Sequence, residues 1–355
     1  MDTMTQLRAG TTLRRGVVRC ALAAVLFGVS APAASRLAED LGPFSLAGLL
    51  YVGAAVAVLP VVGRSRPTAE AIGRSWSRLA VAVVVGGAIG PVLLATGLGH
   101  VSAATASLLL NLELVFTTIV AAVAFREHIG GRVATGTALV AVAGATLAWS
   151  GDAELRWGAV LIAAACLCWA IDNSVTAALD DLAPSHITLA KGVAAGGANL
   201  AIGLVLDGRP PASAALAALV VGALGYGLSI TLWVAGARDL GAARAQLVFA
   251  TAPFVGAVVA WTVLDDAASW RQLIAMAVAA IGVSFVIGSD HFHQHPHHPV
   301  VHDHEHVHDD GHHEHHHSTD GPDEIRHHHV HAHQAVVHHH PHVPDLHHRH
   351  DHDAM

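Results

Sequence analysis

Charged residues are scarce in this sequence: Asp, Glu, Lys and Arg make up 13% of its 355 residues, about half the share of a soluble domain. Aromatic residues make up only 5%. Three cysteines, Cys20, Cys166 and Cys168, fall in apolar runs, and their odd number argues against a disulfide framework. The sequence contains no basic patch for nucleic acid, no Walker loop, no zincin motif and no serine elbow. We therefore do not expect an enzyme, an ATPase or a nucleic-acid-binding protein.

Apolar residues are abundant, at 53% of the chain, and before His291 the sequence is mostly Ala, Val, Leu, Gly and Ile. The apolar runs have about the 20 residues that a helix needs to cross a bilayer. They predict an all-α integral membrane protein with ten transmembrane helices. The predicted spans are 17–34, 44–62, 79–98, 101–125, 133–149, 157–179, 187–206, 214–237, 242–264 and 273–287.

The arginines between the predicted spans indicate the topology. With the N-terminus inside, twelve arginines fall on the cytoplasmic side and four on the outer side, as the positive-inside rule requires. The connection that holds Asp180 and Asp181 is the exception, because it has no Lys or Arg. We predict a multi-pass protein of the plasma membrane with both termini in the cytoplasm.

An internal repeat divides the apolar region. Residues 97–110 resemble residues 236–249 at an offset of 139, which carries Glu127 onto Asp266, both interpreted as structural helix ends. Phe27-Gly28 and Trp169-Ala170 occupy similar places in the first span of each half. Five spans per repeat is an odd number, so the halves are inverted, as in many secondary transporters. The predicted domains are a cytoplasmic N-terminus (1–16), two five-helix repeats (17–150 and 151–289) and a tail (290–355).

Over residues 17–288 these features resemble the EamA-type ten-helix carriers of the drug/metabolite transporter superfamily. Two positions depart from the family pattern, because its Glu-Pro pair appears as Glu113-Leu114 in one half and Ala252-Pro253 in the other. The resemblance implies movement of a small-molecule substrate without ATP, with export common and protons as one coupling ion. A homodimer is compatible with it.

One acidic residue falls near the middle of a predicted span. Thr105, Leu109, Glu113 and Thr117 are spaced by four and share a helix face. Ionisable side chains inside a bilayer are expensive and mark functional sites. We predict that Glu113 binds the coupling proton or a cation, with Thr117 beside it. The alternative is a protonated Glu113 that bonds to a neighbouring helix.

The sixth and seventh spans supply a second polar group. Cys168, Asp172 and Thr176 share one face of the sixth span, and Lys191 and Asn199 share one face of the seventh. The two helices are consecutive and antiparallel, so Asp172 can pair with Lys191. The alternative is that Lys191 extends toward the cytoplasmic surface. We predict that Asp172, Lys191 and Asn199 contribute to the substrate or coupling site.

Glycine and proline interrupt matching spans of the two halves, at Gly86-Gly87 and Gly90-Pro91 and again at 225–227. Matching interruptions point to a binding cavity in transporters, and close helix packing is the alternative. Trp169 and Tyr226 are the predicted aromatic residues of that cavity.

The C-terminal tail is rich in histidine, with 27 His among the 65 residues from His291 onward. Imidazole is a ligand for Zn²⁺, Ni²⁺, Co²⁺ and Cu²⁺. The tail has too little apolar surface for a core, so we predict that it is disordered without metal. A pH-responsive polycation and a low-complexity segment without function are alternatives. The predicted ligands are His302, His304, His306, His308, His312, His313, His315, His316, His317, His327, His328, His329, His331, His333, His338, His339 and His340.

These features together predict a secondary transporter in the lipid bilayer. The predicted substrate is a small metabolite or amino acid, the predicted direction is export, and the tail is a metal-binding regulator. No cofactor is required. One alternative is an exporter of divalent Ni, Co or Zn, and another is a membrane metal sensor or store that transports nothing.

Overall fold

A computed structural model of the protein describes residues 3–63, 67–124, 129–149, 153–176, 179, 182–240 and 242–287, with four seven-residue strands between 291 and 342. The chain divides into two units, Met1–Ser289 and Asp290–Met355. All described helices belong to the first unit and all described strands to the second.

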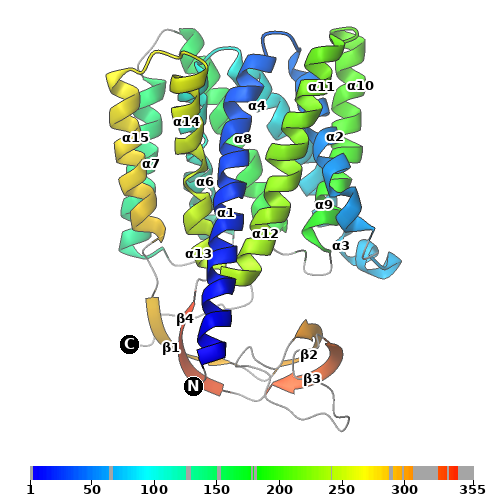
Figure 1. Ribbon diagram of the computed structural model, residues 1–355, viewed down its shortest axis with the longest axis vertical. Coiled ribbons are helices and arrows are strands. Elements are labelled where there is room, and N and C mark those ends of the chain that lie inside the picture. Colours follow the sequence, from blue (N-terminus) through cyan, green and yellow to red (C-terminus); the bar gives the residue numbers. More distant parts are fainter. Residues whose placement is uncertain are drawn as a thin grey trace. The chain divides into compact units, whose positions relative to one another are not determined.

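The helices of the first unit form a bundle in which most run in roughly the same direction or its reverse (Figure 1). The first half contains α1 (Thr3–Leu37), α2 (Pro43–Val62), α3 (Ala69–Val81) continued by the π-helix η1 (Ala82–Ile89) and α4 (Gly90–Leu98), α5 (Ala103–Leu109) with α6 (Leu112–Ala124), and α7 (Gly131–Ala148). The second half contains α8 (Ala153–Thr176), α9 (Pro184–Ala190) continued by η2 (Lys191–Gly196) and α10 (Gly197–Leu206), α11 (Ala212–Val221) continued by η3 (Gly222–Leu228) and α12 (Ser229–Leu240), α13 (Ala242–Phe249) with α14 (Ala252–Val263), and α15 (Trp270–Ile287).

Eight helical segments of the described residues are long and apolar enough to cross a membrane, and two shorter apolar helices, α14 and α15, follow them. The predicted ninth span is not one continuous helix, because α13 ends at Phe249 and α14 begins at Ala252. Pro253 is compatible with the interruption. It lies in the first turn of α14, where its missing N–H is harmless, but it would remove a hydrogen bond from a continuous helix. The all-α membrane fold is confirmed.

The interruption recurs in the other half of the molecule. The fourth span is broken at Leu110 and Asn111, between α5 and α6, and the Asn111 side chain donates to the Leu108 carbonyl (3.0 Å) at the break. Likewise, η1 in the third span and η3 in the eighth are both π-helical. These irregularities fall at matching places of the two halves, whereas η2 in the seventh span has no π-helical counterpart in α2.

Contacts between the two halves are extensive: α1 packs against α12 and α14, α2 against η3 and α10, α4 against α8, and α7 against α15. Glycine permits the closest of these approaches. A Cβ atom on Gly222 would lie only 2.0 Å from the carbonyl oxygen of Leu50, and one on Gly256 would lie 2.7 Å from that of Gly28. Small residues at helix interfaces are typical of proteins whose helices associate within lipid.

The described part of the tail forms two antiparallel pairs: β1 (His291–His297) with β4 (Val336–His342), and β2 (Val300–His306) with β3 (His327–His333). That the tail is disordered without metal stays a prediction. His alternates with other residues in β1 and over residues 302–306 of β2, which matches the period of two of a strand, whereas β3 and β4 each contain three consecutive histidines. Paired backbones satisfy each other's hydrogen bonds.

Candidate functional site

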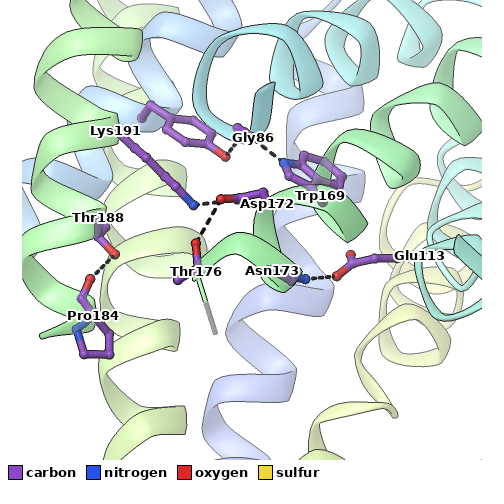
Figure 2. Close-up of polar contacts among 10 residues, drawn as sticks. Gly86, Glu113, Trp169, Asp172, Asn173, Thr176, Pro184, Thr188 and Lys191 are labelled. Carbon is purple, nitrogen blue, oxygen red and sulfur yellow. Dashed lines mark hydrogen bonds and ion pairs between the residues drawn. The ribbon is translucent and has the colours of Figure 1, made fainter. Parts of the chain in front are cut away.

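Asp172 and Lys191 form an ion pair inside the bundle, with 2.5 Å between Lys191 Nζ and Asp172 Oδ2. Thr176, one turn after Asp172 on α8, donates its hydroxyl to Asp172 Oδ1 (3.1 Å). The carboxylate is buried, and the lysine side chain is 15% exposed. The predicted pairing of Asp172 with Lys191 is therefore present (Figure 2).

The backbone of the third span closes over this pair at Gly86. A Cβ atom there would lie 2.2 Å from Asp172 Cγ, so only glycine permits the approach. Gly90 N–H bonds to Val85, five residues earlier, in the π-helical pattern. By the same pattern Pro91 would bond to the Gly86 carbonyl, but proline has no N–H. The Gly86 carbonyl is therefore left for donors outside its own helix.

Two side chains, one from each half of the molecule, donate hydrogen bonds to that carbonyl. Tyr51 on α2 donates its hydroxyl to it at 3.0 Å, and Trp169 on α8 donates its indole N–H at 3.1 Å (Figure 2). A third side chain, Asn199 on α10, donates to the neighbouring carbonyl of Ala88 at 3.1 Å. The irregular segment η1 is thus held by side chains of three other spans.

Glu113 lies at the beginning of α6, directly after the break in the fourth span. Its Oε1 accepts a hydrogen bond of 2.7 Å from Asn173 Nδ2, and the two side chains point toward one another between α6 and α8 (Figure 2). Glu113 is half-buried and Asn173 is exposed, so this pair is more accessible than the pair of Asp172 and Lys191. Asn173 was not among the predicted site residues, although it directly follows Asp172.

The proposed stripe of Thr105, Glu113 and Thr117 is interrupted. Thr105 belongs to α5, whereas Glu113 and Thr117 belong to α6, and the break at Leu110 and Asn111 separates the two helices. Regular spacing by four therefore does not relate Thr105 to Glu113. Thr117, one turn beyond Glu113, is half-buried.

Tyr226 belongs to an aromatic cluster at the interface of the halves. Its ring centre lies 5.8 Å from that of Phe27 in an edge-on arrangement and 5.9 Å from that of Tyr51. Phe27 also contacts Phe249, with 5.3 Å between ring centres. Tyr51 links this cluster to Gly86, so Tyr226 lies one side chain away from the polar site.

Several predicted residues fall elsewhere. Glu127, His308 and the histidines between 312 and 317 lie outside the described residues. The other predicted ligands fall on strands: His302, His304 and His306 on β2, with the remainder on β3 and β4. Among the residues with described side chains, no group of three His, Cys, Asp or Glu is arranged to hold a metal ion.

Two recesses of the helical unit lie away from these polar groups. One, of about 320 Å³, is bordered by Arg36, Glu39, Ser102 and Asp266. The other, of about 330 Å³, has an apolar lining that includes Ile72 and Leu189. In this conformation the polar groups around Asp172 are packed within the bundle.

Comparison with known proteins gives a consistent result. The sequence profile of the EamA-like transporter family matches residues 14–149 and again 156–288. A protein described as an uncharacterized transporter of Methanothermobacter thermautotrophicus is 27% identical over 300 residues, covering 77% of this chain and 87% of the relative. A solved crystal structure with 17% sequence identity has a TM-score of 0.56, covering 76% of this chain and 95% of the other. At 17% sequence identity, this comparison shows that the two proteins share a fold.

Proposed function

The chain belongs to the EamA-like transporter family, and on that premise we propose that it exports a small polar metabolite or amino acid by alternating access. The observation that carries the proposal is the meeting of ionisable and amide side chains from both halves, inside segments that are long enough to span a membrane. Such groups are costly in lipid and are retained for substrate or ion binding. The proposed substrate has both positive and negative groups.

Glu113 is the proposed coupling residue. Asn173 occupies its Oε1, and among the hydrogen bonds of the described residues none involves Oε2. That oxygen can take a proton or the ammonium group of a substrate, while Asn173 keeps the carboxylate in place. The break between α5 and α6 puts Glu113 in the first turn of α6, where a carboxylate is favoured by the helix dipole.

Asp172 and Lys191 form the proposed second polar site. In this conformation they neutralise each other, and the glycine backbone of η1 covers them. Rocking of one half against the other would separate η1 from the pair, since Gly86 belongs to the first half and both charges belong to the second. The pair would then be open to a charged substrate.

The test is flux in sealed proteoliposomes, with a pool of amino acids and metabolites and a panel of Ni²⁺, Co²⁺ and Zn²⁺. Glu113→Gln is compared with Glu154→Gln, which removes an exposed carboxylate at the beginning of α8. We expect an organic solute to move, Glu113→Gln to stop it and Glu154→Gln to leave it unchanged. Movement of metal instead would favour a divalent-metal exporter, and movement of neither would favour a sensor.

The tail is proposed to bind divalent metal and to regulate transport. The strand register that supports this sets His302 opposite His331, His304 opposite His329 and His306 opposite His327. Directly opposed residues of an antiparallel pair share a face and lie about 5 Å apart at Cβ. Equilibrium dialysis of the full chain with Ni²⁺ or Zn²⁺ is expected to give binding that is lost when the chain is cut after Ser289. Equal binding by both would contradict the proposal.

The proposed topology has both termini in the cytoplasm of a plasma membrane. Its support is the distribution of arginine, twelve residues on one side and four on the other. Protease treatment of sealed, right-side-out vesicles tests it, because a cytoplasmic tail is protected and an external tail is removed.

A further inference from the structure

We infer that two polar clusters, centred on Asp239 and Asp266 and joining the two halves at opposite ends of the helical unit, are the gates of the transport cycle. The inference rests on the proposed alternating access. It adds the residues that close each end. We call the clusters the Asp239 clamp and the Asp266 clamp.

The Asp239 clamp is a set of ion pairs between α1 and α12. Arg15 donates from Nη2 to Asp239 Oδ1 (3.1 Å) and from Nε to Oδ2 (3.3 Å). Arg19, one turn later, donates to Oδ2 at 2.7 Å. Two arginines of the first half therefore hold one carboxylate of the second half.

Close helix packing accompanies the Asp239 clamp. A Cβ atom on Gly236 would lie 2.4 Å from Cys20 Sγ, and one on Gly16 would lie 2.7 Å from Leu240 Cγ. Cys20 is fully buried there, in an apolar cluster with Leu240 and Ala245. Separation of α1 from α12 would expose Cys20, which makes this thiol a natural reporter of the clamp.

The Asp266 clamp joins the connection between α14 and α15 to the first turn of α5. Asp266 Oδ2 accepts a hydrogen bond of 3.0 Å from the backbone N–H of Ala104. Gln272 Nε2 donates to Thr105 Oγ1 (2.9 Å) and Ser102 Oγ (3.2 Å). Asp266, interpreted from the sequence as a structural helix end, thus connects the two halves.

Local structure fixes the second clamp in position. Asp265 has a positive φ of 56°, which turns the chain directly before Asp266. Gln272 Oε1 accepts from Ser269 N–H at 2.9 Å and from the Trp261 indole at 3.3 Å. With its oxygen occupied twice, the Gln272 amide can only present its nitrogen to α5.

The clamps lie at opposite ends of α1. Arg15 belongs to the Asp239 clamp, whereas Ser35 and Arg36, about 20 residues or 30 Å further along the helix, border the 320 Å³ recess that Asp266 also lines. Both clamps are formed in this conformation, so the two halves are joined at each end of the helical unit. One clamp must open for a solute to enter and the other for it to leave.

The test uses thiol labelling in nanodiscs and needs no substrate. Cys20 reports on the Asp239 end after Cys166→Ala and Cys168→Ala. Ala103→Cys, in a protein without other cysteines, reports on the Asp266 end, since Ala103 is buried and borders the recess. Asp239→Asn is expected to speed maleimide labelling of Cys20 by about fivefold or more and to slow that of Ala103→Cys. Asp266→Asn is expected to do the reverse.

Glu70→Gln is the matched control, because Glu70 pairs with Arg74 on the same helix, α3, and both side chains are exposed. It is expected to leave both rates unchanged. If either clamp variant speeds both reporters together, the clusters are merely structural, and if neither variant changes a rate, they are not gates. Because labelling needs no solute, this outcome is independent of whether flux is found in proteoliposomes.

Discussion

Removal of one member of the buried ion pair is the perturbation whose cost the structure defines best. Lys191→Met leaves the Asp172 carboxylate without its cation, at a side chain that is 5% exposed. Loss of one partner of a buried pair costs about 3–5 kcal/mol of unfolding free energy. We expect Lys191→Met to lower the unfolding free energy by an amount in this range.

Substitution of the other partner, Asp172, is expected to cost less unfolding free energy. Asp172→Asn keeps the shape and a partner for Thr176, and the remaining Lys191 is not fully buried. It lies seven residues after Pro184, the beginning of its span, so its Cα atom is about 10 Å along the helix from that end, and its long side chain can extend toward the end. The double variant Asp172→Asn, Lys191→Met has no buried charge and is expected to recover most of the loss.

The assay is reversible unfolding in mixed detergent micelles, followed by tryptophan fluorescence, with the four proteins compared as a double-mutant cycle. The exposed pair of Arg36 and Glu39 is the control, and its removal is expected to change the unfolding free energy too little to measure. Equal, small losses that add in the double variant would refute a tightly coupled buried pair.

Three further predictions concern the backbone and the clamps. Gly86→Ala is expected to destabilise the protein by about 1–3 kcal/mol, because the new Cβ would meet Asp172 Cγ at 2.2 Å. Gly73→Ala, whose new Cβ would have nothing within 4 Å, is expected to stabilise the protein by about 0.5–1 kcal/mol. Chemical unfolding measures both changes. Hydrogen bonds from arginine hold the pKa of Asp239 below its ordinary value, so its ionised form is favoured in the folded state. The difference in melting temperature between wild type and Asp239→Asn should be constant above about pH 5 and vanish as the pH falls through the lowered pKa. Asp265→Gly should be tolerated at φ 56°, and Asp265→Val should destabilise by about 1–2 kcal/mol, also measured by unfolding.

The arrangement of spans could be predicted because length and hydropathy are local properties. The repeat was visible because residues 97–110 and 236–249 match at a fixed offset of 139 and because glycine interrupts matching spans of the two halves, and both are local features of the sequence. The break in the ninth span was missed although Pro253 signals it. Its effect depends on where the proline falls within a helix, and spacing alone does not give that position.

The candidate site could be predicted in part. Asp172 and Lys191 were found because consecutive antiparallel helices bring their faces together. Asn173 was missed, because a helical wheel turns it away from Asp172 and says nothing about which other helix it meets. The role of the Gly86 carbonyl depends on Pro91 and on a π-helical register, and hydrophobic patterns carry no information about that register.

The clamps were beyond sequence reasoning for a different reason. Asp266 and Asp239 each bond to residues more than 160 positions away, and nothing local specifies the partner. Polar residues at helix ends are ordinary in membrane proteins, so the repeat marked Asp266 only as the counterpart of Glu127, and nothing distinguished Asp239 from its neighbours.

The orphan carbonyl of Gly86 also has a consequence for biogenesis. Its second donor, Trp169, is 83 residues further along the chain, and Asn199, the donor for Ala88, is 111 residues beyond its acceptor. At synthesis rates of 5–20 residues per second, Trp169 emerges about 4–17 s after Gly86. During that interval Tyr51, which precedes Gly86 in the chain, is the available side-chain donor to the Gly86 carbonyl, whereas Asn199, the donor to Ala88, has not yet been made. The side-chain hydrogen bonds that hold η1 are therefore complete only after the second half has been synthesised, and a chain that ends between the halves would lack the donors Trp169 and Asn199.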